Sequence, residues 1–158
     1  MTAPTGVAWA VFAAREPELA AFGTTRMASA PCYLATIRAD GTPRVHPVTP
    51  IVANQALFLF TEPTSPKASD LAERGWFALH NDIADDAGTG GESWVRGHAA
   101  LSDDPIGRQH ATNAAAYTPE PGYPPHELLI TEVRGTGYGD TLLPATKRWT
   151  PTTETRNP

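Results

Sequence analysis

The sequence predicts one mainly β domain: an antiparallel barrel of six or seven strands with helices at its periphery. Three observations support this fold class. The chain has 158 residues, the size of a single domain. Several short segments have the two-residue or continuous apolar pattern of strands. Turn signals such as Asp40-Gly41 and Asn54-Gln55 join neighbouring segments, and no strand-helix-strand rhythm indicates a parallel sheet.

The first 28 residues predict two short helices. Apolar residues recur there at roughly helical spacing, namely Trp9, Phe12, Leu19 and Phe22. Pro17 interrupts the pattern, because proline inside a helix removes a backbone hydrogen bond, but it suits the first helical position. We therefore expect a second helix that begins near Pro17 and ends at Gly23.

The next part of the chain predicts three successive strands in a meander. Residues 32–38 alternate with a period of two, and Asp40-Gly41 provides a tight turn. Residues 43–53 form the returning strand, and the apolar run 56–61 fits a buried strand. Because the prolines of the returning strand donate no ladder hydrogen bond, we expect it at a sheet edge, bulged, or paired on one side only.

The remainder predicts two more helices and four more strands. A helix is expected from about Ser65 to Arg74, with Ser65 as its cap, and another from about Pro105 to Tyr117. The strand candidates are Trp76–His80, Glu92–Leu101, Glu127–Val133 and Thr141–Trp149. We expect one domain over residues 1–151 and a disordered tail over residues 152–158.

Composition and charge exclude several function classes. Lys and Arg number 12 and Asp and Glu 17, so the net charge of −5 argues against a nucleic-acid partner. No stretch approaches the roughly 20 apolar residues of a membrane span, and no secretory signal begins the chain. The single Cys32 forms no internal disulfide. We expect a soluble, cytoplasmic protein without a membrane partner.

No side-chain pattern predicts a metal site or a hydrolytic nucleophile. The five histidines lack the paired spacing of metal ligands, and no GxSxG motif is present. We therefore expect no metal and assign no catalytic residue.

The segment 60–67 combines hydroxyl groups, an ammonium group and a helix start. The first turn of a helix attracts anions through its free N–H groups and its dipole. A phosphate there would be held by backbone amides and by Thr61, Ser65 and Lys67. The alternative is plain helix capping by Ser65, with Lys67 as a solvated surface charge.

A second candidate is the proline-interrupted segment 44–50. If the Asn54-Gln55 hairpin forms, this segment lies beside Phe60 and Thr61, and its unpaired backbone groups would bind the heteroatoms of a planar aromatic ligand. For His46 the alternative is a sheet histidine that is bonded to a neighbouring residue.

These two segments resemble the flavin-binding split barrels typified by pyridoxamine 5′-phosphate oxidase. The similarity runs from about Pro17 to Trp149 and is most specific over residues 33–50 and 57–67. The resemblance implies a six-stranded split β-barrel that forms a homodimer. It also implies that FMN, or in some relatives the deazaflavin F420, binds in each of two clefts at the interface.

The resemblance further implies which residues contact the cofactor. Across the interface they are Glu92 and Trp149, and within one subunit they are His46, Pro47, Val48, Thr49, Phe60, Thr61, Ser65 and Lys67. At three positions the chain departs from the oxidase. An arginine of the oxidase is replaced by His46, a phosphate-binding arginine by Pro66, and a glutamine by Glu92.

The function implied is that of a flavin-binding oxidoreductase, in which FMN or F420 carries hydride or electrons to or from a small molecule. Its substrate pocket is expected to include Trp94, Tyr117 or Tyr123. The three departures from the oxidase leave an alternative from another class. In that alternative the protein is a non-catalytic dimeric split barrel, a carrier of a small molecule or cofactor that has lost tight FMN binding.

Overall fold

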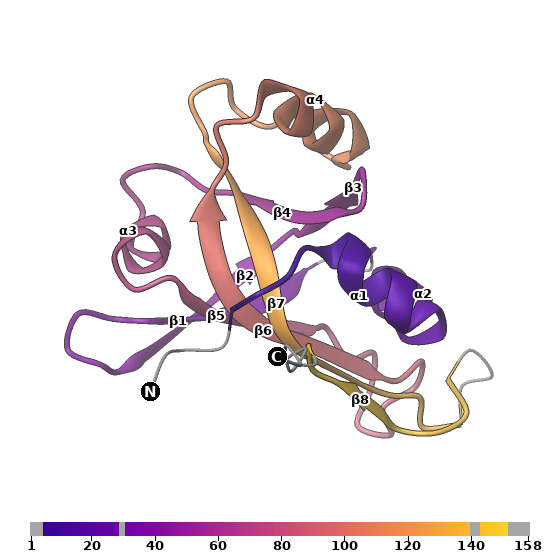
Figure 1. Cartoon of the computed structure of the whole chain (residues 1–158). Coiled ribbons are helices and arrows are strands. Elements are labelled where there is room, and N and C mark those ends of the chain that lie inside the picture. The colour runs from indigo at the N-terminus through magenta and orange to yellow at the C-terminus, as the bar shows by residue number, and fades with distance from the viewer. Residues whose placement is uncertain (1–4, 29–30, 140–142, 152–158) are drawn as a thin grey trace, which may run out of the picture.

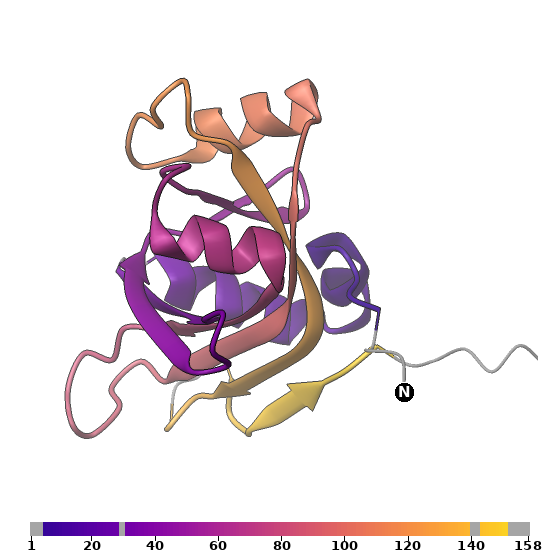
Figure 2. The same cartoon turned by 90° about the vertical axis from the view of Figure 1, so that its left-hand side faces the viewer.

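A computed structural model describes residues 5–28, 31–139 and 143–151. One antiparallel sheet curls into a half-barrel with helices around it (Figures 1 and 2). The eight strands of the described chain are β1 (Cys32–Ile37), β2 (Pro43–Val48), β3 (Ile51–Ala53), β4 (Ala56–Phe60), β5 (Trp76–Asn81), β6 (Glu92–Leu101), β7 (Pro125–Thr136) and β8 (Lys147–Trp149). The predicted split β-barrel is confirmed. Its eight strands are one more than the upper number of the six or seven expected.

The long strands β6 and β7 form the middle of the sheet. The strand order is β2-β1-β5-β6-β7-β4-β3, and β8 also pairs with β7. The ladder between β6 and β7 shifts register between Arg96 and Gly97. A Cβ atom on Gly97 would lie 1.8 Å from the carbonyl oxygen of Leu129, so this bulge requires glycine.

Four helices lie around the sheet: α1 (Trp9–Arg15), α2 (Pro17–Ala28), α3 (Pro66–Glu73) and α4 (Pro105–Ala114). In Figure 1, α3 lies on one side of the sheet, α1 and α2 on the other, and α4 across one end. The predicted helix starts are confirmed. Ser65 caps α3 by accepting a hydrogen bond from the Ala68 N–H, and Asp104 caps α4. The α4 helix ends three residues before Tyr117, where we expected its end.

The predicted end of the second helix at Gly23 is wrong, because α2 continues to Ala28. Gly23 is buried in the helix, and a Cβ atom there would lie 3.3 Å from Ser93 Oγ and 3.5 Å from the Trp9 ring. This glycine therefore serves the close packing of α2 against its neighbours.

The single returning strand predicted over residues 43–53 is also wrong. The chain turns at Thr49 and Pro50, so that β2 pairs with β1 whereas β3 pairs with β4. The two halves lie at opposite ends of the strand order, and the three predicted strands form no meander. The expected edge position of the proline-containing segments is confirmed, because β2 and β3 are the two ends of that order.

The last strands differ from the expectation in length. The β7 strand begins at Pro125 and ends at Thr136, which extends the predicted strand 127–133 in both directions. The β8 strand covers only the end of the predicted strand 141–149, and residues 140–142 lie outside the described residues. The predicted disordered tail, residues 152–158, lies outside them as well.

The main hydrophobic core fills the space between the sheet and the helix pair α1–α2. Its largest fully buried side chains include Phe12, Leu19, Phe22, Leu34, Leu79, Leu128 and Ile130. A smaller cluster lies under α4 and consists of Ile51, Ala53, Phe58, Phe60 and Ala111. The site described below lies outside both clusters, where β2 meets α3.

Candidate functional site

The side chains of β2 alternate between two environments. Val45 and Pro47 are exposed, and Val45 has 64% of its surface accessible. On the other face, Arg44 and His46 are half-buried and Val48 belongs to the main core. This alternation turns Arg44 and His46 toward the side of the sheet that α3 covers.

Asp70 of α3 holds the two elements together. Its carboxylate is buried and accepts hydrogen bonds from Thr36 Oγ1 at 2.7 Å, Arg44 Nε at 2.9 Å and Arg74 Nη2 at 3.1 Å. Burial alone would raise the pKa of Asp70, but these three hydrogen bonds outweigh it and hold the pKa below its ordinary value. Asp70 is therefore ionised and fixes the direction of the Arg44 side chain.

The first turn of α3 combines a cap with a cation. Ser65 Oγ accepts a hydrogen bond from the Ala68 N–H at 3.3 Å, which leaves the hydroxyl hydrogen free to donate. Pro66 has no N–H. The N–H of Lys67 lies in the first turn of the helix, where no carbonyl group of the helix can accept from it. The Lys67 ammonium forms no ion pair with any described residue, although it lies close enough to His46 to affect that ring.

The ring of His46 lies within electrostatic reach of this cation. Burial lowers the pKa of His46, Lys67 and Arg44 lower it further, and Asp70 opposes them. His46 is therefore neutral at pH 7, with one ring nitrogen that accepts and one that donates. Its Nε2 is buried and has no hydrogen-bond partner among the described residues. A buried polar atom without a partner is uncommon and indicates room for a ligand group or a water molecule.

The structure thus brings together His46, Ser65 and Lys67, but not the other residues assigned to the same subunit. Thr61 is almost fully buried, with its Oγ1 3.3 Å from His126 Nδ1, and Phe60 packs under α4. Val48 lies in the core, and Pro47 is exposed on the opposite face of β2. Thr49 lines a cavity of about 190 Å³ that includes neither His46 nor Lys67. The expectation that segment 44–50 lies beside Phe60 and Thr61 is wrong, because β3 rather than β2 pairs with β4.

The residues assigned across the interface lie elsewhere in the subunit. Glu92 Oε2 is 3.5 Å from His80 Nε2 at the start of β6. The ring of Trp149 in β8 packs against Phe12, with 5.1 Å between the ring centres. Figures 1 and 2 show β8 and α3 at different sides of the molecule. Their contacts with a cofactor in a second subunit stay a prediction.

The proposed substrate-pocket residues are also dispersed. Trp94 lies on β6 with Arg96 over its ring, whereas Tyr117 and Tyr123 lie between α4 and β7. Burial raises the pKa of Tyr117.

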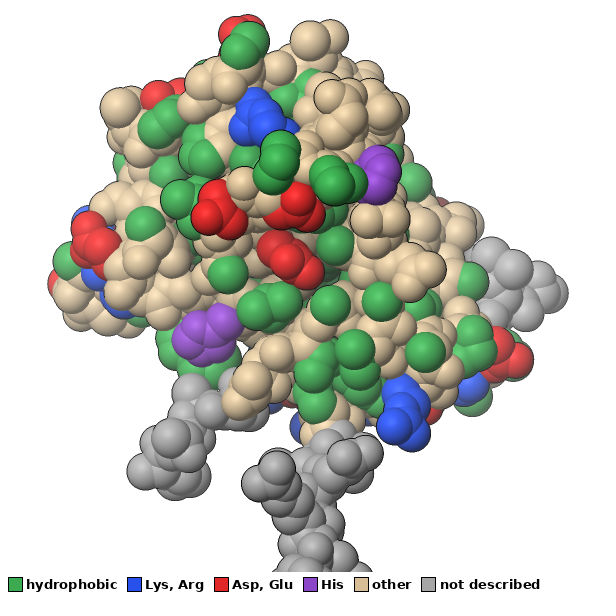
Figure 3. Space-filling view, turned by 45° about the horizontal axis from the view of Figure 1, so that its top comes forward, with side chains coloured by type: hydrophobic (Ala, Val, Ile, Leu, Met, Phe, Trp, Pro, Cys, Tyr) green, Lys and Arg blue, Asp and Glu red, His purple; other side chains and the backbone are tan. Residues whose placement is uncertain are grey.

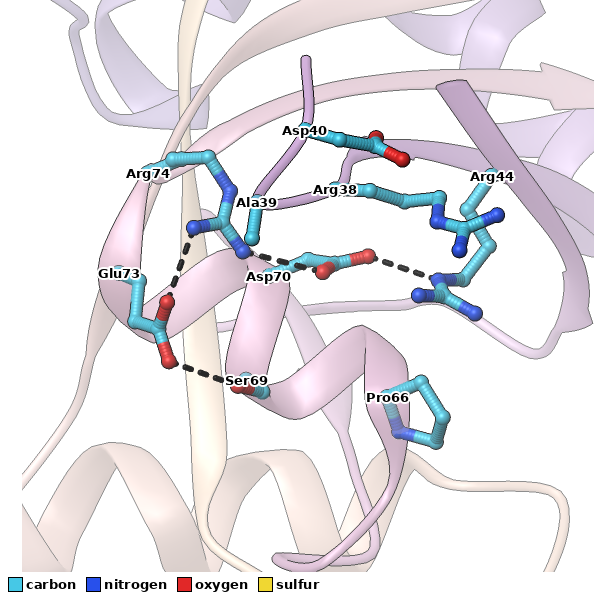
Figure 4. Close-up of a pocket in the computed structure, with 9 residues that line it drawn as sticks. All are labelled: Arg38, Ala39, Asp40, Arg44, Pro66, Ser69, Asp70, Glu73 and Arg74. Carbon is cyan, nitrogen blue, oxygen red and sulfur yellow. Dashed lines mark hydrogen bonds and ion pairs between the residues drawn. The ribbon is translucent and has the colours of Figure 1, made fainter. Parts of the chain in front are cut away.

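One cavity of about 380 Å³ lies between the β1–β2 hairpin and α3 (Figure 4). It is lined by Arg38, Ala39, Asp40, Arg44, Pro66, Ser69, Asp70, Glu73 and Arg74. Two other cavities, of about 190 and 550 Å³, have no charged residue in their walls. Our sequence interpretation included Arg44 only as the first residue of segment 44–50, without a role of its own, and did not include Arg38 or Asp70 as site residues. The alternation of β2 was a signal for Arg44, since it lies two residues before His46 on the same face.

Elsewhere on the described chain, Arg96 and Arg148 lie on either side of the buried Glu132, and both form ion pairs with it. The face seen in Figure 3, with the α4 end turned forward, shows acidic side chains near its middle, hydrophobic side chains spread over it, and lysines and arginines that lie apart from one another. The described residues include no cluster of three or more His, Cys, Asp or Glu suited to a metal ion. No helix among them is both long and apolar enough to span a bilayer.

Comparison with known proteins shows the fold. No protein-family model matches the sequence, and no curated protein matches it either. Solved structures match over most of the chain. A heme binding protein from Mycobacterium smegmatis has a TM-score of 0.67 at 17% identity, covering 95% of this chain and 60% of its own. PhzG from Burkholderia lata 383, in complex with tetrahydrophenazine-1-carboxylic acid, has a TM-score of 0.62 at 17% identity, covering 96% and 90%.

A third structure, a candidate pyridoxamine 5′-phosphate oxidase from Listeria innocua, has a TM-score of 0.58 at 13% identity and covers 77% of this chain and 97% of its own. The chain has the split-barrel fold of the pyridoxamine 5′-phosphate oxidase-like proteins. This fold is one that oxidoreductases use. The chain spans about three fifths of the M. smegmatis protein. At 13% to 17% identity, these similarities show the fold alone.

Proposed function

We propose that this split barrel is a flavin-binding oxidoreductase that uses FMN, with F420 as the alternative cofactor. The observation that carries the proposal is the β2–α3 site, where a neutral His46 with an unpartnered Nε2 lies within electrostatic reach of Lys67 at the start of a capped helix. Such a site suits the phosphate group that both cofactors carry.

The residues present fit a phosphate in three ways. The Lys67 ammonium supplies a cation that forms no ion pair with a described residue, although it lies close enough to help lower the pKa of Glu62. The Ser65 hydroxyl and the Lys67 N–H supply donors. His46 supplies a neutral ring nitrogen beside them. A bound flavin supplies hydride or electron transfer, while the protein binds it, orients it and limits the access of water. No side chain of the site is assigned to proton transfer.

We further propose that the protein is a homodimer with its cofactor sites at the interface. The outer face of β2, β1 and β5 exposes Val45, Tyr33 and Trp76 on one surface of the sheet, in different cross-strand rows. An apolar face of this kind suits burial against a second copy. Nε2 of His80, on the same face, lies 3.5 Å from Glu92 Oε2, so a copy seated there would come close to Glu92.

The test is a titration of the purified protein with FMN and with F420, followed by absorbance and fluorescence. We expect saturable binding of one of them. Lys67→Ala should weaken it by roughly 10- to 100-fold, the value of one charge-assisted hydrogen bond. The matched control is Lys147→Ala, since Lys147 pairs with Glu18 on the surface. Uptake of neither cofactor would contradict the proposal and leave the carrier alternative.

A further inference from the structure

The cavity between the β1–β2 hairpin and α3 contains more free donors than free acceptors. Its three acidic residues already have partners. Asp70 accepts three hydrogen bonds, Glu73 accepts from Ser69 and Arg74, and Asp40 accepts from the backbone and hydroxyl groups of Thr42. The acids of this cavity therefore have little capacity left to bind further cations.

The three arginines are used unequally. Each of the three Arg74 nitrogens has a partner, because Nε donates to the Ile37 carbonyl oxygen and the terminal nitrogens donate to Glu73 and Asp70. Arg44 uses only Nε, and the two terminal nitrogens of its guanidinium have no partner among the described residues. The Arg38 side chain has no hydrogen bond or ion pair with a described residue, although its charge helps to lower the pKa of Asp40.

The guanidinium groups of Arg38 and Arg44 reach into the same part of the cavity. Figure 4 shows Arg38 and Arg44 extending from the hairpin toward the end of the cavity where Pro66 begins α3. Like charges that share a cavity repel each other, so an anion between them would be stabilised by both. The hydrogen bond from Arg44 Nε to Asp70 also fixes this guanidinium, which lowers the entropy cost of binding.

We propose that this cavity binds a phosphate group, with Arg38 and Arg44 as its two cations and Asp70 as the residue that positions Arg44. Two guanidinium groups with free terminal N–H donors match the several acceptor oxygens and the double charge of a phosphomonoester. A volume of about 380 Å³ leaves space for the group that the phosphate is attached to. His46 and Lys67 do not line this cavity, so the inference goes beyond the proposed flavin site.

The test is a titration of ¹⁵N-labelled full-length protein with inorganic phosphate, with chloride used to keep the ionic strength constant. We expect saturable shifts of the amide signals of residues 38–44 and 66–74. Arg38→Gln should weaken the apparent affinity about tenfold, as the loss of one charge-assisted hydrogen bond predicts. Arg15→Gln is the matched control, because Arg15 is an exposed arginine in α1.

Arg44→Gln should weaken phosphate binding by at least as much. Because Arg44 also donates a hydrogen bond to Asp70, Arg44→Gln is expected to lower the stability of the protein as well. The Arg38 side chain bonds no described residue, so Arg38→Gln changes the binding site alone and is the decisive variant. The proposal is overturned if chloride alone produces the same shifts, if the shifts do not saturate, or if Arg38→Gln binds phosphate as tightly as the wild type.

A second arm repeats the titration with FMN and with riboflavin, which lacks the phosphate. If FMN displaces inorganic phosphate from these residues and riboflavin does not, the cofactor is the source of the phosphate. If FMN binds without displacing it, a phosphorylated substrate is the source. Phosphate binding without any binding of FMN or F420 supports this proposal and contradicts the proposed function. Flavin binding without a response to phosphate overturns this proposal alone.

Discussion

Replacing Asp70 by asparagine tests whether one buried carboxylate holds the β1–β2 hairpin against α3. Asparagine has nearly the same shape but only one acceptor oxygen. If that oxygen keeps the bonds from Thr36 and Arg44, the amide nitrogen faces the Arg74 Nη2 donor, which is 3.1 Å from the carboxylate in the wild type. At least one charge-assisted hydrogen bond is lost, and the bond from Arg44 loses its counter-charge.

A charge-assisted hydrogen bond contributes about 1.5 to 3 kcal/mol. The side chains of Arg44 and Arg74 are 28% and 24% exposed, so water screens part of this loss. We expect Asp70→Asn to lower the free energy of unfolding by about 2 to 3 kcal/mol, as measured by urea denaturation. Glu73→Gln is the matched control, since Glu73 pairs with the same Arg74 but is 58% exposed. A change within about 0.5 kcal/mol for Asp70→Asn, or an equal loss for Glu73→Gln, would refute the reasoning.

The same carboxylate gives the stability a pH dependence of known sign. The pKa of Asp70 is lower in the folded than in the unfolded chain. The contribution is therefore fully present above the pKa of an unfolded aspartate, about 4, and is lost as the pH falls through the folded pKa. Asp70→Asn should remove this part of the acid dependence, so that its loss of stability relative to wild type shrinks below about pH 4.

Four further outcomes are expected. Burial raises the pKa of the Cys32 thiol to about 11, so a thiol reagent at pH 8 should modify it only as fast as the protein unfolds, and rapid labelling of folded protein would be inconsistent with this. Gly97→Ala should cost about 3 kcal/mol in urea denaturation, because its Cβ atom meets the Leu129 carbonyl oxygen. The pKa of His46, measured by NMR, should lie below that of an ordinary histidine and rise when an anion binds beside it. Val45→Asp should convert the proposed homodimer into a monomer in light scattering, and a monomeric wild type would exclude the dimer.

Signals local to a few residues were enough to predict many elements. Ser65 followed by Pro66 marks the start of α3, and Asp104 marks that of α4. The strand Glu92–Leu101 has the predicted limits. Strand partners were harder, because a period of two shows which residues share a face but not which strand lies alongside. The β1 strand pairs with β5, which follows it only after three further strands and a helix, and no local signal in the sequence predicts this pairing.

The candidate site shows the same limit. The helix start with Ser65 and Lys67 was visible in the sequence because its residues are neighbours in the chain. Asp70 was not, because its partners Thr36 and Arg44 precede it by 34 and 26 residues. An aspartate in the middle of a short helix looks like a solvated residue until a second element covers it.

The Asp70 network also bears on the two positions where the chain has no arginine although the oxidase has one. At His46 and Pro66 the chain lacks a permanent charge, but the β1–β2 hairpin brings Arg38 and Arg44 to the same end of α3. Positive charge at this end of α3 is therefore supplied by Arg38, before β2, and by Arg44 of β2 itself. The position of these two arginines depends on the β1–β2 hairpin. Asp70 holds this hairpin against α3 by accepting hydrogen bonds from Thr36 and Arg44. A variant that releases the hairpin should thus weaken anion binding at this end of α3 even when every cation is retained, and Asp70→Asn is that variant.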